Sequence, residues 1–398
     1  MFLPHPFFKG APRGVSHSRP RVVLVVAFFL LAVASSRANA QQPAPTPTPQ
    51  PPPAQQVQPG EEVLTVESNL VQLNVGVVDR SGRAVMNLSQ NEFAVYEDGV
   101  RQTIRSFEPT QTPFSVVLLL DLSGSTLAFR TQLKMAALRF VDALAPDDRV
   151  AVVAFWEEKR VKEPRTVNRV VTLSGFTTDR SKIGFTLRDA VPNGGGGTNL
   201  YEALRSSLSM LAKEGKRRKA VVVLTDGVDT STSAEDRAAT INAKTGDEAV
   251  AAIKPEANAT LNSVLSEADH TGVAVYPLAL PSGDLKQLLA YNRQQRGTSA
   301  DADPAFDDPT PQQVAVYTAA RARLDALANR TGGRLYVINR LEDLARQYAE
   351  VAAEMRTIYA ISYQSGGAKT HDGRWRAIRV EVSRPELIAR TKPGYYAR

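Results

Sequence analysis

Segments with the pattern of strands alternate with segments with the pattern of helices from Phe114 to about Val351. In the first helical segment, Leu133, Ala137 and Phe140 recur at helical spacing on one face. We expect strands at 115–120, 149–156, 167–173, 220–225, 273–278 and 334–337, and helices at 131–144, 200–214, 259–270, 314–331 and 341–355. Alternation of this kind predicts an α/β fold: a doubly wound, mostly parallel sheet with helices on both faces.

The segments on either side of this region have the pattern of β structure instead. Within 61–110, alternating apolar residues predict strands, Asp98-Gly99 predicts a hairpin turn, and residues 89–92 have the pattern of a one-turn capping box. A second β segment covers 357–398. Neither segment is long enough to form a core of its own. We therefore expect the two to build one small β module beside the α/β domain.

The first 40 residues have the features of a secretory signal peptide. Basic residues precede an apolar stretch at 22–34, and Ala38-Asn39-Ala40 fits a small-residue cleavage site. The apolar stretch is short for a membrane span, which needs about 20 residues. A linker rich in proline, glutamine and threonine follows at 41–60, where we expect disorder. These features predict a protein exported to the periplasm, the cell surface or the medium, with no membrane span after cleavage.

Composition excludes several classes of site and partner. The chain has no cysteine, which excludes disulfides, thiolate metal sites and cysteine nucleophiles. The formal charge is +7, but residues 1–40 hold five basic residues and no acidic ones, so the rest of the chain is near +2. This balance disfavours nucleic-acid binding. The one basic run, at 216–219, is expected to be a solvated turn.

Three polar clusters fall where the ends of strands are expected. Asp121, Ser123 and Ser125 come directly after the first strand, and Thr198 follows a run of four glycines. The strand at 220–225 runs into Asp226. In an open parallel sheet, ligands bind beyond the carboxyl ends of the strands. We therefore expect these clusters to meet at one edge of the sheet.

Together these residues resemble the metal-ion-dependent adhesion site of the von Willebrand factor type A (VWA) family, which is D-x-S-x-S with a downstream Thr and a downstream Asp. The resemblance covers 112–345, and the "GGTNLYEAL" and "LTDGVD" contexts share it. The flanks resemble the VWFA-related group abundant in acidobacterial exported proteins, with an "EDG" hairpin before the domain and "GYY" after it. The resemblance implies a divalent cation, Mg²⁺ or else Mn²⁺ or Ca²⁺, with the metal ligands Asp121, Ser123, Ser125, Thr198 and Asp226.

The resemblance also implies a binding function and no catalysis. Carboxylate and hydroxyl oxygens are hard ligands, as these cations require. In the family arrangement few carboxylates touch the metal, so the ion retains positive charge and an open coordination position. Such an ion attracts an Asp or Glu carboxylate from a protein partner. We therefore expect a non-enzymatic protein-interaction or adhesion module.

Other interpretations remain open from the sequence. Asp121 could cap the next helix and the serines could be solvated turn residues, or the protein could be a metal-independent scaffold that binds through its β module. A metal-dependent hydrolase would need a general base, for which Asp226 or Asp229 is the candidate. The glycine run is no phosphate loop, because no lysine precedes Thr198. An acidic segment with Asp301, Asp303, Asp307 and Asp308 is expected to be solvated and not to bind calcium.

Overall fold

The computed structural model describes residues 70–159, 166–215, 217–280, 309–365 and 372–397. All described residues belong to one compact unit. The expected signal peptide at 1–40, the linker at 41–60 and the acidic segment at 301–308 lie outside the described residues.

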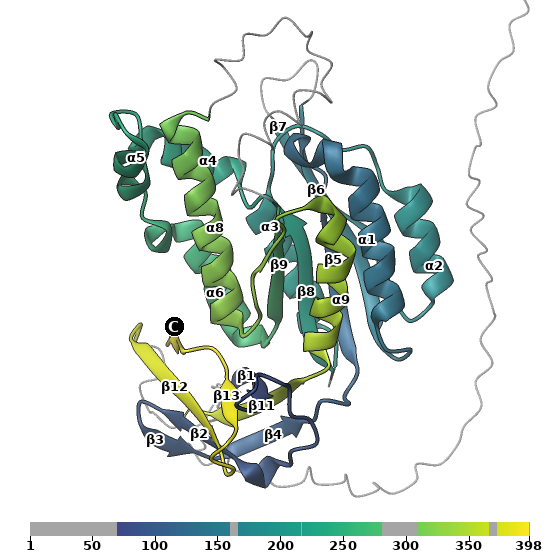
Figure 1. The fold of residues 1–398 in the computed structure, drawn as a ribbon, viewed down its shortest axis with the longest axis vertical. Helices are drawn as coiled ribbons and strands as arrows, with labels where there is room; N and C mark the ends of the chain where they lie inside the picture. Colours follow the sequence, from purple (N-terminus) through teal and green to yellow (C-terminus); the bar gives the residue numbers. More distant parts are fainter. Residues whose placement is uncertain (1–69, 160–165, 216, 281–308, 366–371, 398) are drawn as a thin grey trace, which may run out of the picture. The chain divides into compact units, whose positions relative to one another are not determined.

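A six-stranded sheet forms the centre of the α/β domain, in the order β10-β9-β8-β5-β6-β7 (Figure 1). All neighbours are parallel except β7, which pairs antiparallel with β6. The sheet is therefore mixed and mostly parallel, which confirms the predicted fold class. Its strands are β5 (Phe114–Asp121), β6 (Arg149–Lys159), β7 (Thr166–Thr177), β8 (Arg218–Thr225), β9 (Ala274–Ala279) and β10 (Tyr336–Val337).

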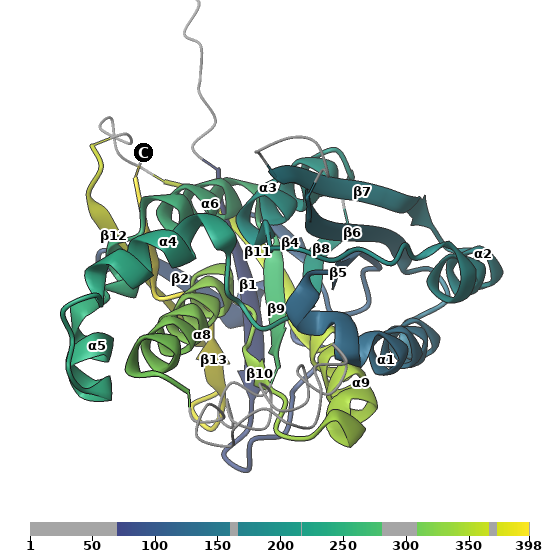
Figure 2. The same cartoon turned by 90° about the horizontal axis from the view of Figure 1, so that it is seen from above.

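Helices cover both faces of this sheet (Figure 2). On one face, α1 (Arg130–Ala143), α2 (Arg180–Phe185) and α9 (Leu344–Met355) pack with alternate residues of β5 such as Leu118. On the other face, α3 (Leu200–Ala212), α6 (Ala259–Thr271) and α8 (Pro311–Thr331) pack with residues such as Leu119. Every residue of β5 is buried, as a central parallel strand requires.

Several helical segments were not predicted from the sequence. They are α2, which continues into the π-helical η3 (Thr186–Ala190), together with α4 (Thr230–Ala239) and α5 (Gly246–Ala252). Short 3₁₀ turns complete the domain at η2 (Gly124–Phe129), η4 (Pro255–Ala257) and η6 (Leu341–Asp343). The connection between β8 and α6 is thus largely helical, and α5 buries Ala249 in a small cluster with α8.

Strands from both ends of the described chain build the β module, as predicted. One sheet has the order β13-β1-β11-β4 and the other β14-β12-β2-β3, so each sheet combines N-terminal and C-terminal strands. A single apolar cluster that includes Leu73, Val95 and Tyr359 lies in this module. The predicted capping box is present at η1 (Gln90–Glu92), where Ser89 and Glu92 cap each other. The strands are β1 (Leu70–Val78), β2 (Phe93–Glu97), β3 (Val100–Gln102), β4 (Ile104–Glu108), β11 (Ile358–Gln364), β12 (Trp375–Val382), β13 (Ile388–Arg390) and β14 (Gly394–Tyr396).

One residue of the basic run has a structural role that the sequence did not indicate. Arg218 is buried at the start of β8, so the prediction of a solvated turn is wrong for this residue. Its guanidinium donates to the carbonyls of Thr112 at 2.6 Å, Met355 at 3.1 Å and Ile358 at 2.6 Å. These carbonyls belong to the two connections between the α/β domain and the β module. Arg218 therefore binds both connections at once.

Candidate metal centre

Asp121 is fully buried at the carboxyl end of β5, and both of its carboxylate oxygens accept hydrogen bonds. The backbone N–H of Ser123 donates to Oδ1 at 2.9 Å. The hydroxyl of Thr225, at the end of the adjacent strand β8, donates to Oδ2 at 2.6 Å. Because β5 and β8 are parallel neighbours, their ends meet, and these two bonds fix the carboxylate between them.

The two serines of the loop connect Asp121 to the second carboxylate. The hydroxyls of Ser123 and Ser125 lie 3.0 Å apart, within hydrogen-bonding distance. Ser125 also hydrogen-bonds the side chain of Asp226, and the backbone N–H of Val228 donates to Asp226 Oδ1 at 3.0 Å. Four of the five predicted ligands are therefore joined in one hydrogen-bonded group.

Thr198 lies on the neighbouring loop and is buried, but its hydroxyl makes no hydrogen bond to the other four residues in the described structure. The loop itself is held against the Asp121 loop: Gly195 N–H donates to the Leu122 carbonyl, and Gly124 N–H to the Gly196 carbonyl, both at 2.8 Å. The backbone of Thr198 is fixed in turn by Thr230 of α4. The structure therefore brings the loop of Thr198 to the site without a direct side-chain contact.

Glycine is required in this loop because the backbone passes very close to its neighbours. Gly194 and Gly196 have φ values of +58° and +77°, which side chains rarely adopt. A Cβ atom at Gly194 would lie 2.4 Å from the Leu122 carbonyl oxygen, and one at Gly196 would lie 2.2 Å from the Glu157 carbonyl oxygen. The glycine run thus serves close packing between the ends of β5 and β6.

The electrostatics of the site favour a cation. Burial raises the pKa of Asp121, the nearby Asp226 raises it further, and hydrogen bonds from Ser123 and Thr225 oppose the rise. Burial also raises the pKa of Asp226, with Ser125 opposing it. Within the described residues neither carboxylate has an ion pair. Two buried carboxylates held close without an ion-paired base are the environment that a bound divalent cation would stabilise.

The donor set fits Mg²⁺, Mn²⁺ or Ca²⁺. Two carboxylates and the hydroxyls of two or three Ser and Thr residues are all hard oxygen ligands. In the part of the chain that the structure describes, no group of three or more His, Cys, Asp or Glu side chains could hold a metal ion. A site built on carboxylates alone is thus absent there, and any cation at this edge of the sheet would depend on the hydroxyls.

Sequence reasoning missed two residues at this site. Thr225 gave no signal, because a hydroxyl at the end of a buried strand is common and its bond to Asp121 depends on strand order. Arg130 directly precedes the helix predicted at 131–144 and was not predicted to belong to the site, yet its guanidinium donates to the Leu122 carbonyl at 2.7 Å and the Ser123 carbonyl at 3.3 Å. It is half-buried and its charge interacts with that of Asp121.

Asp229, the candidate base of a hydrolase, has a structural role. It is buried and forms the N-cap of α4, accepting the backbone N–H of Ser231 at 2.9 Å. Its other carboxylate oxygen accepts the backbone N–H of Tyr201 at 3.2 Å. Both oxygens are therefore committed to fixing the ends of two helices, which leaves Asp229 poorly placed to take a proton.

Comparison with known proteins supports the assignment of this domain. The von Willebrand factor type A domain family model matches residues 116–229. Among curated proteins, no match to the chain was found.

The solved structures that match the chain share little sequence with it. A von Willebrand factor type A protein from Catenulispora acidiphila is 14% identical to the chain. The match covers 84% of this chain and 64% of that protein, with a TM-score of 0.39. The vWF domain of the type V pili tip protein Mfa5 from Porphyromonas gingivalis is 13% identical. The match covers 61% of this chain and 94% of that domain, with a TM-score of 0.39. An aerotolerance-related membrane protein from Bacteroides fragilis is 13% identical. The match covers 61% of this chain and 99% of that protein's chain, with a TM-score of 0.37. At these TM-scores the likenesses carry no weight in the assignment.

The family match begins within β5 and ends at the N-cap of α4, so it includes the loops of Asp121, Thr198 and Asp226. The order of strands and helices in the structure agrees with it. The match and the fold together identify this part of the chain as a von Willebrand factor type A domain.

Proposed function

We propose that the VWA domain binds one divalent cation and uses it to engage a carboxylate of a protein partner. Domains of this family generally mediate protein–protein interaction and are generally not enzymes. The cation would be held by Asp121, Ser123, Ser125, Thr198 and Asp226, and when bound it would supply an exposed positive charge. The observation that carries the proposal is the hydrogen-bonded group in which two buried carboxylates converge with two serine hydroxyls.

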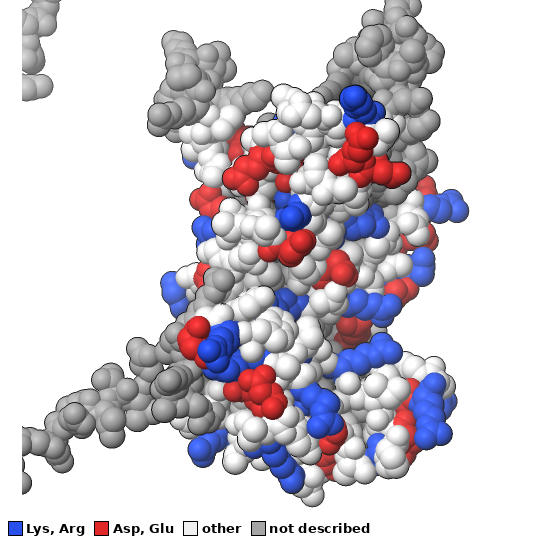
Figure 3. Space-filling model, turned by 90° about the vertical axis from the view of Figure 1, so that its left-hand side faces the viewer, with Lys and Arg blue, Asp and Glu red and all other residues white. Residues whose placement is uncertain are grey.

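Charge in and around the site supports an acidic partner. Two carboxylates offset a divalent cation, and the half-buried guanidinium of Arg130 then leaves the site with excess positive charge. Elsewhere, Figure 3 shows acidic and basic side chains interspersed on one face, without a single-sign field there of the kind that nucleic acid requires. Among the described residues no helix is long and apolar enough to span a membrane.

Isothermal titration calorimetry with Mg²⁺, Mn²⁺ and Ca²⁺ tests the metal site. Asp121→Asn keeps the shape of the side chain but removes its charge, so we expect metal binding to be lost or greatly weakened. Asp247→Asn is the matched control, because Asp247 is an exposed residue at the start of α5. Equal affinity in the wild type and in Asp121→Asn would refute the proposed site.

The partner chemistry is tested with capped tripeptides, acetyl-Gly-Asp-Gly amide and its asparagine counterpart. We expect the acidic peptide to compete for the site in Mg²⁺, and we expect this binding to disappear in EDTA and in Asp121→Asn. Metal binding without any metal-dependent peptide binding would refute the second half of the proposal and leave the first intact.

Export is proposed from the sequence of residues 1–40 alone. Fractionation of cells that express the full chain, with N-terminal sequencing of the product, tests it. Cleavage after Ala40 and recovery outside the cytoplasm are expected, and an intact N-terminus in the cytoplasmic fraction would contradict export.

A further inference from the structure

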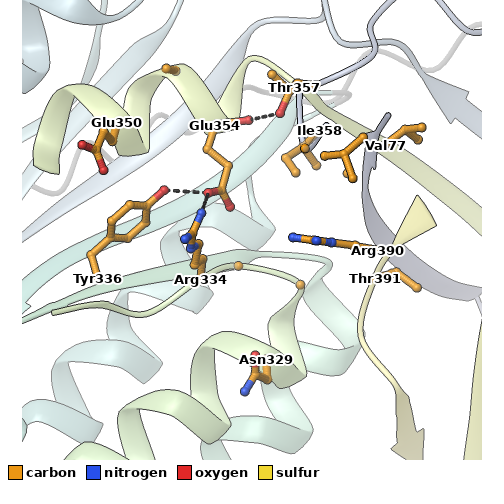
Figure 4. Close-up of a pocket in the computed structure, with 17 residues that line it drawn as sticks. Val77, Asn329, Arg334, Tyr336, Glu350, Glu354, Thr357, Ile358, Arg390 and Thr391 are labelled. Atoms are coloured by element: carbon orange, nitrogen blue, oxygen red, sulfur yellow. Dashed lines mark hydrogen bonds and ion pairs between the residues drawn. The ribbon is translucent and has the colours of Figure 1, made fainter. Parts of the chain in front are cut away.

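A cavity of about 630 Å³ lies where the β module meets the VWA domain (Figure 4). Its walls come from the end of β1, the C-terminal end of α8, β10, the end of α9 and β13. None of its lining residues belongs to the candidate metal centre. Its volume is in the range of small-molecule sites in proteins, roughly 300 to 1,000 Å³.

Arg390 contributes to this cavity a positive charge that no described acidic side chain pairs with. Its side chain extends from β13 towards Arg334 and Glu354 (Figure 4). In the described part of the chain, its guanidinium has neither a hydrogen bond nor an ion pair. The neighbouring Thr391 adds a buried hydroxyl without a hydrogen-bond partner. The cavity therefore offers both a charged and a neutral donor that the fold itself does not use.

The other charged groups of the cavity have protein partners. Arg334 lies 3.5 Å from Glu354 and stacks on the Tyr336 ring at 5.4 Å. Glu354 also accepts the Tyr336 hydroxyl at 2.6 Å. Glu350 is paired with Arg346, outside the cavity, at 3.0 Å. The donors left without a protein partner are therefore Arg390 and Thr391, and a negatively charged hydrogen-bond acceptor would match them.

The surroundings select a singly charged anion. Glu350 and Glu354 line the same space, and so does Gly332, the C-cap of α8, where the helix dipole places partial negative charge. A dianionic phosphate would be repelled by these groups. A carboxylate has one charge and two oxygens that match the planar fork of a guanidinium.

We propose that this cavity binds a carboxylate of a peptide, either a C-terminal carboxylate or an Asp or Glu side chain, with Arg390 as its principal partner. The Thr391 hydroxyl donates a second hydrogen bond. This site is separate from the metal centre and needs no cation.

Calorimetry in EDTA with three capped peptides tests the proposal and separates the two sources of carboxylate. Acetyl-Ala-Ala-Ala has a free C-terminus, acetyl-Ala-Asp-Ala amide has an acidic side chain, and acetyl-Ala-Ala-Ala amide has neither. We expect at least one of the first two to bind and the third not to bind. EDTA removes any contribution from the metal centre, so failure here leaves the proposed function untouched.

Two variants locate the binding. Arg390→Gln should weaken it by about tenfold or more, because a charge-assisted pair is lost. Ala353→Trp, on the cavity wall at the exposed side of α9, should block binding by volume without changing charge. Arg340→Gln is the matched control, since Arg340 is exposed and does not line the cavity. Absence of binding by both acidic peptides, or binding that Arg390→Gln leaves unchanged, would overturn the proposal.

Discussion

Arg130 places a fixed positive charge behind the loop that carries the candidate ligands. Its guanidinium is held by the carbonyls of Leu122 and Ser123, and its charge acts on Asp121. The residue therefore opposes a bound cation and favours a bound anion. This makes Arg130 a determinant of how strongly the site would hold metal and how strongly it would hold an acidic partner.

Replacing Arg130 should change the two affinities in opposite directions. In Arg130→Met we expect Mg²⁺ to bind about tenfold more tightly, because a like charge is removed from a partly buried site. Acidic-peptide binding in saturating Mg²⁺ should weaken. Calorimetry measures both quantities.

The control for this change is Arg139→Met, which removes an exposed arginine from the same helix α1. A fall of both affinities in Arg130→Met would show that the residue only maintains the shape of the loop, and would contradict the electrostatic role.

Among the elements of the domain, the glycine loop before α3 has little freedom to change. Gly196 combines a positive φ with a backbone carbonyl 2.2 Å from the position of an added Cβ. Gly99, in the turn between β2 and β3, has a φ of +80° but open space around it. Comparing substitutions at Gly196 and Gly99 therefore separates the free-energy cost of a positive φ from the cost of a steric clash with the neighbouring backbone.

Gly196→Ala should therefore destabilise the protein more than Gly99→Ala. The strained φ costs each variant about 1 kcal/mol, and displacement of the loop adds roughly 1 to 3 kcal/mol for Gly196→Ala alone. Urea unfolding measures the difference, and calorimetry with Mg²⁺ should show weaker binding for Gly196→Ala only. Equal unfolding midpoints would mean that the loop relaxes at little cost.

The elements show why prediction from sequence succeeded in some places and failed in others. The strand β5 and the helix α3 were predictable because buried runs and helical spacing are local signals. The helix α5 was not, because it is short and is stabilised by Ala249 packing on α8, a contact distant in the sequence. The antiparallel direction of β7 likewise depends on its pairing with β6 and leaves no local pattern.

The same distinction between local signals and distant contacts applies to the residues of the candidate site. The D-x-S-x-S pattern, Thr198 and Asp226 were visible as polar residues at strand ends. The hydrogen bond from Thr225 to Asp121 and the position of Arg130 beside Leu122 depend on which strands are neighbours and how the loop turns. Such contacts become visible only in three dimensions.

In the whole molecule, Arg218 holds together the two connections between the VWA domain and the β module. Burial lowers its pKa to about 10, which leaves it charged at neutral pH, and its guanidinium packs over the Phe114 ring at 4.1 Å. Removing it leaves the carbonyls of Thr112, Met355 and Ile358 without this donor.

Arg218→Met should destabilise the protein by about 2 to 4 kcal/mol, because several buried acceptors lose a charged donor. Arg205→Met, at an exposed position on α3, is the control and should have little effect. Thermal unfolding compares the two. A midpoint for Arg218→Met equal to that of the control would show that the connections are held by other contacts.

A second contact between the β module and the VWA domain should make stability depend on alkaline pH. The ammonium group of Lys392 is buried 3.2 Å from Asp269, which also pairs with Arg330 at 2.7 Å. Burial lowers the pKa of Lys392, Asp269 opposes this shift and Arg330 adds to it. In the unfolded chain the lysine keeps its ordinary pKa near 10.5. Between the lowered pKa and 10.5 the unfolded state therefore binds more protons, so this lysine makes stability rise with pH across the window and causes no further change at pH values below it.

The Lys392→Met variant lacks the contribution of this ammonium group to the pH dependence, and it shares every other titrating group with the wild type. The free energy of unfolding of the wild type, relative to Lys392→Met, should increase as pH is raised towards 10.5. Urea unfolding across alkaline pH measures this difference, with Lys213→Met, at the exposed C-cap of α3, as the control that should show no trend. A difference that stays constant with pH would mean that Asp269 offsets the burial of Lys392 completely. A difference that grows would show that burial of the charged Lys392, at the contact between the β module and the VWA domain, has a desolvation cost that Asp269 does not fully offset.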